Sequence, residues 1–223
     1  QGYYVVDADI EKFFDNVNHS KLIKQIWSLG IQDKQLLYVI KRILTAPIRM
    51  QDGSTVIPDK GTPQGGIISP LLANIVLNEL DWWIARQWEE HPVAISRGRN
   101  RVIGKTEVFD KSHGYRLMKN TALKEMHIVR YADDFLIMFE YENEAKQVYE
   151  LLNKRLAKFG LEMEREKTRI LPFGRYKGTK ETFDFLGFMH YNGITKTGKY
   201  TVGHKMSKKK RKLKQQAITN IEE

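Results

Sequence analysis

The chain has 223 residues, of which 41% are hydrophobic and 29% are charged, and its net charge is +10 at pH 7. This composition supports a sizeable core and argues against a largely disordered protein. No apolar run reaches the 18 residues of a transmembrane helix, so no membrane partner is expected. Because there is no cysteine, disulfides and thiolate metal sites are excluded, which fits a reducing compartment. The chain opens on Gln1 without a signal peptide, and we expect it to be part of a longer protein.

The basic excess is concentrated near the C-terminus. Nine of the 37 Lys and Arg residues lie between Lys196 and Lys214, a segment that contains no Asp or Glu. A basic stripe is typical of proteins that contact a phosphate backbone, because neutralised phosphates release counterions. A solvated helix face or an import signal is the alternative, and charge favours contact with nucleic acid.

The first predicted element is a strand at 3–9, where β-rich residues alternate. A helix at 20–28 stops at Gly30, and an amphipathic helix follows at 34–44. Residues 47–58 predict a hairpin that turns at Asp52-Gly53. A loop rich in Gly and Pro at 61–69 precedes a long helix at about 70–88, with Ser69 as the N-cap and Pro70 as the first helical residue.

In the second half, residues 93–124 are expected to be irregular. Residues 126–139 predict a strand, a turn and a strand, and 143–159 an amphipathic helix that ends at Gly160. Short strands are expected at 168–172, 182–190 and 200–203, and a basic helix at 205–221. Because strands and helices mix without strict βαβ alternation, we predict an α+β fold with an antiparallel sheet.

The first candidate for chemistry is Asp9, at the end of an apolar strand, where an acid is usually avoided. Taken alone, its position is equally well explained by an exposed acid that caps the next turn.

The second candidate is the pair Asp133-Asp134 at the turn of an apolar hairpin. Such turns favour Asn-Gly or Asp-Gly, and adjacent carboxylates repel each other, although a solvated acidic turn remains the alternative. Bound Mg²⁺ would offset the repulsion, since it is usually held by one or two carboxylates plus substrate phosphates. Asp9 and Asp133, on two strands that could lie side by side, together predict a two-metal site, in which one ion activates a primer 3′-OH and the other binds a triphosphate.

The order of the motifs resembles that of reverse transcriptases, and most specifically the class encoded by group II introns, also called maturases. The resemblance covers about residues 2–188 and rests on Ala8-Asp9-Ile10-Glu11-Lys12-Phe13-Phe14-Asp15-Asn16-Val17-Asn18-His19, Gly61-Thr62-Pro63-Gln64-Gly65-Gly66-Ile67-Ile68-Ser69-Pro70-Leu71-Leu72-Ala73-Asn74, Tyr131-Ala132-Asp133-Asp134, Gly160-Leu161 with Lys167-Thr168, and Phe185-Leu186-Gly187-Phe188. The second block and the Tyr-Ala-Asp-Asp tetrad are highly specific in combination.

The resemblance implies a polymerase palm at 1–204, with an antiparallel sheet packed on helices and partial fingers elements at about 20–60. It implies a basic helix at 205–223 that leads into a thumb or X domain outside this chain. The upstream fingers, with basic residues that hold the triphosphate, are also missing, so the chain by itself is expected to be nearly inactive.

Site roles also follow from the resemblance. The implied catalytic triad is Asp9, Asp133 and Asp134, and the implied ligands of two Mg²⁺ ions, with Mn²⁺ as a substitute, are these three and the Ile10 carbonyl. The implied nucleotide-binding residues are Phe14, Pro63, Gln64, Gly65 and Lys167, among which Phe14 would exclude a 2′-OH. The implied primer and template contacts are Tyr131, Phe185, Leu186, Gly187, Lys208, Lys209, Lys210, Arg211 and Lys212.

Without the resemblance, some of these residues have simpler explanations. Phe14 would be a core aromatic beside Phe13, and Lys167 an ordinary surface lysine. The loop around Gln64 would be a turn that leads into a helix, and the segment at Phe185 a core strand.

The function that these expectations describe is an RNA-directed DNA polymerase that uses dNTPs, an RNA template and a DNA primer. We expect it to bind intron RNA as well, for which the basic cluster Arg97, Arg99, Arg101 and Lys105 is suited. The alternatives are a splicing cofactor in which polymerisation is secondary, and another bacterial reverse transcriptase, either diversity-generating or CRISPR-linked. A signal-type cyclase, which shares the palm, is disfavoured by the Gln64 loop and Phe14.

The expected setting is the bacterial cytoplasm, or an organelle if the source is eukaryotic. The helix that contains Trp82, Trp83 and Trp88 could be core or a face for homo-oligomerisation, and the sequence leaves both open.

Overall fold

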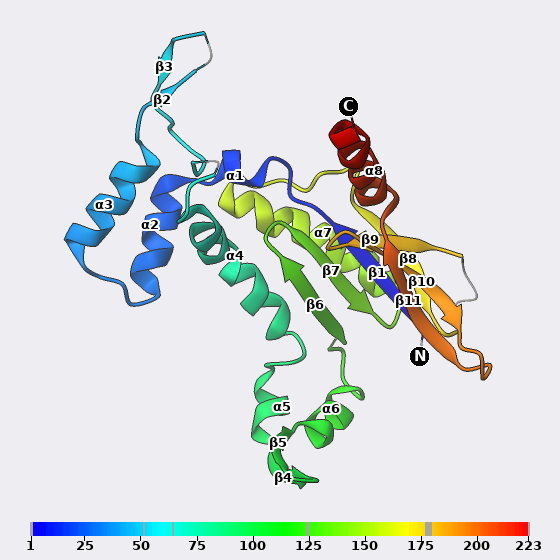
Figure 1. The fold of residues 1–223 in the computed structure, drawn as a ribbon. Coiled ribbons are helices and arrows are strands. Elements are labelled where there is room, and N and C mark those ends of the chain that lie inside the picture. The colour runs from blue at the N-terminus through cyan, green and yellow to red at the C-terminus, as the bar shows by residue number, and fades with distance from the viewer. Residues whose placement is uncertain (1, 51, 64, 124, 177–179, 223) are drawn as a thin grey trace.

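A four-stranded antiparallel sheet forms the centre of the structure (Figure 1). The structure is a computed structural model that describes residues 2–50, 52–63, 65–123, 125–176 and 180–222. Strands β1 (Gly2–Ala8), β6 (Met126–Tyr131), β7 (Asp134–Phe139) and β8 (Arg169–Gly174) lie in the order β6-β7-β1-β8. Because β1 pairs antiparallel with both β7 and β8, the predicted α+β fold with an antiparallel sheet is confirmed.

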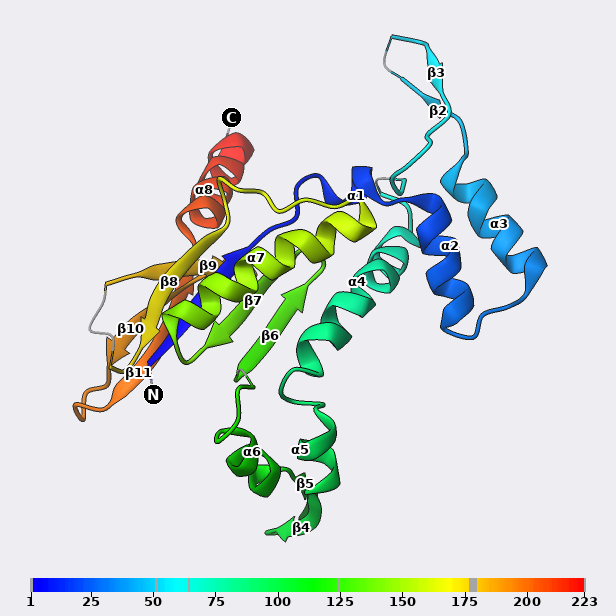
Figure 2. The same ribbon diagram turned by 180° about the vertical axis from the view of Figure 1, so that it is seen from behind.

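Helices cover one face of this sheet. Figure 2 shows α7 (Glu142–Phe159) across the strands, with α4 (Ser69–Ala85) beside it. The main core lies between the sheet and these helices. It includes Val6 and Ala8 of β1, Ile137 of β7, Leu77 of α4 and Leu152 of α7. The period of two along β1 therefore sends alternate side chains into this core.

A second, three-stranded sheet covers part of the other face. It consists of β9 (Thr182–Phe185), β10 (Phe188–Ile194) and β11 (Tyr200–Met206), in the order β11-β10-β9. Its contact with the central sheet is a smaller core built from Val5, Leu136, Leu171, Phe173, Phe183 and Phe185. The prediction of one strand at 182–190 is wrong, because Leu186 and Gly187 adopt left-handed backbone conformations that separate β9 from β10.

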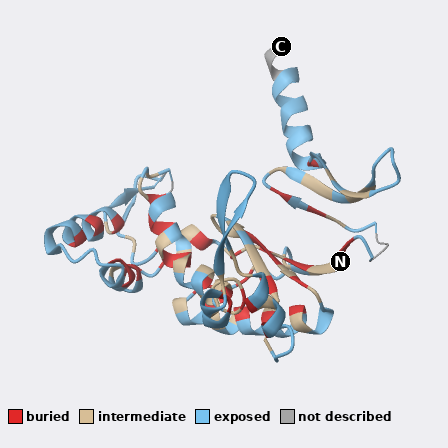
Figure 3. Ribbon diagram, turned by 90° about the horizontal axis from the view of Figure 1, so that it is seen from below, coloured by how far each residue is buried: buried red, intermediate tan, exposed pale blue. Residues whose placement is uncertain are grey.

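Helix α8 (Lys208–Glu222) follows β11 and is exposed along its described length (Figure 3). The helix was expected to start at 205, but Lys205 and Met206 pair with β10 as the last residues of β11.

Helix α1 (Phe13–Asn16), α2 (His19–Ser28) and α3 (Lys34–Leu44) follow β1, and a small hairpin of β2 (Ile48–Arg49) and β3 (Thr55–Val56) comes next. The predicted helices and the hairpin are thus confirmed. Gly160 ends α7 in a left-handed conformation, as expected. In the described residues, none of the helices combines the length and the hydropathy of a membrane span.

The start and the end of α4 differ from the prediction. Ser69 is the first helical residue rather than the N-cap, because its hydroxyl donates to the carbonyl of Pro63 at 2.6 Å. The helix ends at Ala85, and Trp88 beyond it is buried with Ala94 and Met118 in a separate small core. Trp88 is therefore a core residue rather than part of an association face.

The expectation that residues 93–124 are irregular is wrong. This segment forms α5 (Pro92–Ser96), a hairpin of β4 (Arg99–Ile103) and β5 (Thr106–Asp110), and α6 (Ser112–Met118). We call residues 92–118 the projecting arm, because they extend away from the central sheet (Figure 1). The side chains of β4 are exposed on both faces, so the strand lacks the apolar alternation by which strands are predicted.

Gly61 joins the loop before α4 to the segment after β1. Its backbone N–H donates to the Val17 carbonyl at 2.7 Å, and the N–H of Thr62 donates to the Phe14 carbonyl at 2.7 Å. Gly61 has a φ of +90°, and a Cβ there would lie 3.0 Å from the carbonyl oxygens of Phe14 and Asp15. Only glycine satisfies both constraints, because neither backbone oxygen can move aside cheaply.

We expect Gly61→Ala to destabilise the protein by about 2–3 kcal/mol, the sum of left-handed strain and a backbone clash. Gly53→Ala is the matched control, because Gly53 has a φ of +86° but no atom within 4 Å of its Cβ position. The control should cost only about 1 kcal/mol. Urea unfolding of both variants measures the difference, and equal losses would contradict the close packing at Gly61.

Candidate active site

The register of β1 against β7 decides which acidic side chains share a face. Ala8 pairs with Phe135, and continuing this register by one residue sets Asp9 opposite Asp134. Side chains alternate along a strand, so Asp7 and Asp9 point away from the helix-covered face that Val6 and Ala8 occupy. The pairing therefore gathers carboxylates from two strands at one end of the sheet.

The hairpin between β6 and β7 presents a further acid. Tyr131 pairs with Asp134, which leaves Ala132 and Asp133 as the turn. Ala132 has a φ of 54°, a left-handed conformation that is unfavourable for a residue with a Cβ. Turns of this length match the twist of the strands when their central backbone is left-handed, which explains the conformation at Ala132.

Burial and neighbouring charges raise the pKa of both acids of the Asp133-Asp134 pair. Partial burial, and then the charges of Asp7, Asp9 and Asp133, raise the pKa of Asp134 to about 6. Burial and the charge of Asp9 also raise the pKa of Asp133, against the opposing effect of Lys167. The site thus holds negative charge that its own cations balance only in part.

Lys167 forms an ion pair with Asp9, a member of the predicted triad. Its Nζ donates to Oδ2 of Asp9 at 2.9 Å, although its side chain is 65% exposed. The backbone holds its loop against the end of β1, since the N–H of Glu164 donates to the Asp9 carbonyl at 2.9 Å. Ile10, whose side chain is buried, forms a bridge with Met163 in the same junction. Lys167 therefore lies at the predicted site rather than on an unrelated surface.

Asp7 is a fourth acid that the sequence reasoning missed. Burial raises its pKa, while a hydrogen bond from Arg169 Nε to its Oδ2 at 3.1 Å acts in the opposite direction. The available signal was the spacing of two from Asp9, which places both on one face of a strand. The guanidinium of Arg169 also donates to the Thr182 carbonyl at 2.9 Å, so this ion pair ties the central sheet to β9.

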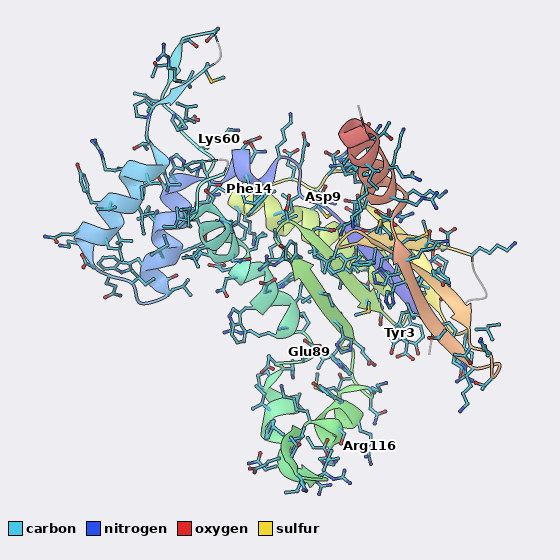
Figure 4. The ribbon with its side chains drawn as sticks, in the orientation of Figure 1. Tyr3, Asp9, Phe14, Lys60, Glu89 and Arg116 are labelled. Carbon is cyan, nitrogen blue, oxygen red and sulfur yellow. The ribbon has the colours of Figure 1, made fainter. Side chains whose placement is uncertain are left out.

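Among the residues predicted to bind nucleotide, Lys167 contacts Asp9, and Phe14 lies further along the same edge of the molecule. Figure 4 shows Asp9 and Phe14 along the same edge of the molecule. Phe14 is half-buried and makes an edge-to-face contact with Phe13 at 5.3 Å, and its carbonyl is bonded to the Pro63 loop through Thr62. Gly65 is exposed with a φ of 77°, and Gln64 lies outside the described residues.

The predicted primer and template residues fall into two groups. Phe185 is buried in the smaller core, so its side chain is structural. Tyr131 is 66% exposed, and the turn before β10 consists of exposed Leu186 and half-buried Gly187. The basic run at the start of α8 is exposed, namely Lys208, Lys209, Lys210, Arg211 and Lys212. One of these, Lys210, places its Nζ over the Phe188 ring at 5.3 Å, which joins α8 to that turn.

The predicted RNA-binding cluster lies on the projecting arm, away from α8 in both ribbon views (Figures 1 and 2). Arg97, Arg99, Arg101 and Lys105 are all exposed there. Arg101 is partly neutralised by Asp110 at 3.5 Å. The structure therefore does not join this cluster to the acidic site.

Among the described residues, no three His, Cys, Asp or Glu side chains are arranged so that they could hold a metal ion by themselves. The donors fit a divalent cation that takes only one or two carboxylates and completes its shell with substrate oxygens, as Mg²⁺ usually does.

A family model described as reverse transcriptase (RNA-dependent DNA polymerase) matches residues 1–190. The chain belongs to this reverse transcriptase family. The resemblance inferred from the motifs is thus confirmed. Reverse transcriptases generally use divalent metal ions, in agreement with the donor set described above.

Related proteins include intron-encoded ones. The putative COX1/OXI3 intron 1 protein of Saccharomyces cerevisiae is 32% identical over 75% of this chain and 22% of its own length. The group II intron-encoded protein LtrA of Lactococcus lactis is 30% identical over 75% of this chain and 32% of its own length. The chain thus spans about a fifth to a third of these curated relatives.

The fold is similar to that of a solved telomerase. Apo telomerase from Candida tropicalis, truncated from its C-terminal domain, aligns with a TM-score of 0.55 at 14% identity. The alignment covers 91% of this chain and 36% of that one. This similarity confirms a fold like that of a polymerase palm.

The raised pKa of Asp134 predicts how stability depends on pH. A carboxyl with a folded pKa of about 6, above its ordinary value of 3.8, binds its proton more tightly in the folded state. Its stabilising contribution is therefore present below pH 3.8 and is lost as the pH rises toward 6. Asp134→Asn should stabilise the metal-free protein at pH 7.5 by about 1 kcal/mol, after allowance for solvent screening, and have little effect at pH 4.

Urea unfolding at both pH values measures this difference. Glu150→Gln, which changes an exposed acid on α7 in the same way, should shift stability little at either pH. If Asp134→Asn destabilises the protein at pH 7.5, the repulsion inferred for the site is wrong.

Proposed function

We propose that this chain is the catalytic palm of an RNA-directed DNA polymerase encoded by a group II intron, and that it adds dNTPs to a primer 3′-OH by a two-metal mechanism. The observation that carries the proposal is the convergence of Asp9, Asp133 and Asp134 at one end of the sheet, where burial and neighbouring carboxylate charges raise the pKa of Asp133 and of Asp134. Such an arrangement costs stability without a ligand, so binding of cations is the physical reason to retain it.

Asp9 and Asp133 are the proposed main ligands of Mg²⁺, with Asp134 and the Ile10 carbonyl as auxiliaries. Bound Mg²⁺ would lower the pKa of the primer hydroxyl and offset charge on the leaving pyrophosphate. Lys167, which is exposed and held by one carboxylate, can exchange Asp9 for the triphosphate at little cost, because exposed ion pairs are weak.

Phe14 and the Pro63 loop are proposed to shape the nucleotide site. The hydrogen bond from the Thr62 N–H to the Phe14 carbonyl holds the segment that carries the Phe14 ring next to that loop. An aromatic ring under the incoming sugar would leave no room for a 2′-OH, which favours dNTPs over rNTPs. Gln64 and Gly65 would then meet the nucleotide from the loop.

The first turn of α8 supports contact with a primer–template backbone. Its basic run, from Lys208 to Lys212, occupies the helix N-terminus, where the helix dipole disfavours positive charge. The run is therefore unfavourable for the helix itself, whereas bound phosphates would be attracted by both the side chains and the dipole. Leu186 and Gly187 would act beside it as the primer grip.

We expect Asp133→Ala to abolish Mg²⁺-dependent extension of a DNA primer on an RNA template, with a loss of at least about 1000-fold. The reason is that a displaced or missing ion removes most of the electrostatic stabilisation of the transition state. The measurement uses the protein that carries this chain, and Glu150→Ala on α7 serves as the control with unchanged activity. If the unmutated protein binds RNA tightly but makes no DNA, it is a splicing cofactor on a polymerase scaffold.

A second candidate role, binding of intron RNA, is favoured by the exposure of β4 on both faces and by the arm's basic cluster. The small core of Trp88, Ala94 and Met118 at the base of the arm includes no residue of the β4–β5 hairpin. Surface of this kind is available for a partner rather than needed for folding.

Replacing Arg97, Arg99 and Arg101 together with Ala should weaken binding of intron RNA and reduce its salt dependence, because phosphate contacts release counterions. Extension on a generic template should be unchanged. Replacing Lys146, Lys154 and Lys158 of α7 with Ala removes the same charge elsewhere and is the matched control. Equal intron affinity of the two triple variants, measured by filter binding across a salt series, would exclude the arm as the RNA contact.

A further inference from the structure

Arg130 lies in β6, one residue before the Tyr131-Ala132-Asp133-Asp134 tetrad, and its side chain is only 11% exposed. Its guanidinium makes four hydrogen bonds to three residues. Nε donates to Asp81 Oδ1 at 2.8 Å and Nη2 to Asp81 Oδ2 at 2.5 Å, a two-pronged contact. Nη1 donates to Asn74 Oδ1 at 3.1 Å and to the Ala132 carbonyl at 2.8 Å. We call these four bonds the Arg130 clamp.

One end of the clamp acts on the turn that carries Asp133. Ala132 has an unfavourable left-handed conformation, and such a conformation persists only when surrounding contacts over-determine it. The bond from Arg130 to the Ala132 carbonyl fixes the peptide that joins Ala132 to Asp133. The position of the Asp133 carboxylate therefore depends on a side chain that does not itself reach the site.

The other end of the clamp is α4. Asn74 and Asp81 are seven residues apart, close to two helical turns, so both face β6 from the same side of the helix. The same helix starts at Ser69, whose hydroxyl holds the Pro63 carbonyl of the predicted nucleotide loop. A rigid helix thus connects this loop to the turn of the acidic site.

We propose that Arg130 is a positioning residue that couples the loop preceding α4 to the Asp133 turn, so that the two halves of the active site keep one fixed spacing. The inference rests on the proposed polymerase function. It predicts that weakening the clamp affects the chemical step more than binding of primer and template, because a carboxylate displaced by about 1 Å can cost up to about 100-fold in rate.

A second tether on β6 provides a matched control. His127 Nδ1 and Glu89 Oε1 are 2.6 Å apart at the other end of the strand, in the segment that follows α4. This pair also joins β6 to residues beyond α4, but neither partner is bonded to the Ala132-Asp133 turn in the part of the chain that the structure describes. If the Arg130 clamp only stabilised the fold, both tethers would have comparable consequences.

The key variant is Arg130→Lys, because lysine keeps the charge and can pair with Asp81 but cannot form the planar fork that also reaches the Ala132 carbonyl. Glu89→Gln is the control. We expect Arg130→Lys to lower kcat at saturating dNTP by about 10- to 100-fold and to raise the Mg²⁺ concentration for half-maximal rate, with unchanged Kd for primer–template. Glu89→Gln should leave all three near their original values.

Hydrogen–deuterium exchange of the metal-free protein tests the clamp without reference to activity. Arg130→Lys should increase exchange at 131–135, whereas Glu89→Gln should not. Unchanged exchange there, or equal losses of kcat in the two variants, overturns the proposal. If the unmutated protein makes no DNA at all, the proposed function fails, and with it the effect of Arg130 on the chemical step; the exchange result then decides only whether the clamp holds the turn.

Discussion

Backbone pairing between β1 and β7, with Ala8 opposite Phe135, determines which side chains meet at the candidate site. A slip of one residue would exchange the two faces of β1 and carry Asp9 into the helix-covered core. Both faces resist this slip, because Val6 and Ala8 pack toward the helices while Val5 packs against the second sheet. The apolar packing on both sides of β1 is therefore what keeps carboxylates together at its end, against their mutual repulsion.

Asp7 in β1 and Asp9 just after it are paired with cations that are held in place to different degrees. Arg169 holds Asp7 and is itself fixed by the Thr182 carbonyl, so the inner acid is tied into the fold. Lys167 holds Asp9 by a single exposed contact, which solvent screens and a competing cation can replace. Asp7 thus has a structural partner, whereas Asp9 keeps a displaceable one. This difference agrees with the proposed roles, in which Asp9 binds metal and Lys167 moves to the triphosphate.

The sequence correctly predicted those strands, turns and helices that are specified by apolar periodicity and by turn or cap residues. The strand before Asp9, the hairpin around Asp133 and the helix ended by Gly160 each combine apolar periodicity with a turn or cap residue. The hairpin of the projecting arm was missed because it has no buried face, and periodicity reports only burial. Arg130 was missed for another reason, because its partner Asp81 lies 49 residues away and only the tertiary fold brings the two together. Asp7 could have been found from its spacing of two from Asp9, but its partner Arg169 lies 162 residues away.

The distribution of charge connects the site to the rest of the chain. The basic residues of α8 and of the arm lie on elements that project from the central sheet, while the end of that sheet is acidic (Figure 1). A nucleic-acid backbone would be attracted to the projections and repelled by Asp9, Asp133 and Asp134 until cations neutralise them. Under the proposed function, the protein can thus hold RNA without placing a primer terminus at the carboxylates. Binding of Mg²⁺ and entry of the primer terminus are then linked by charge alone, since each lowers the electrostatic cost of the other.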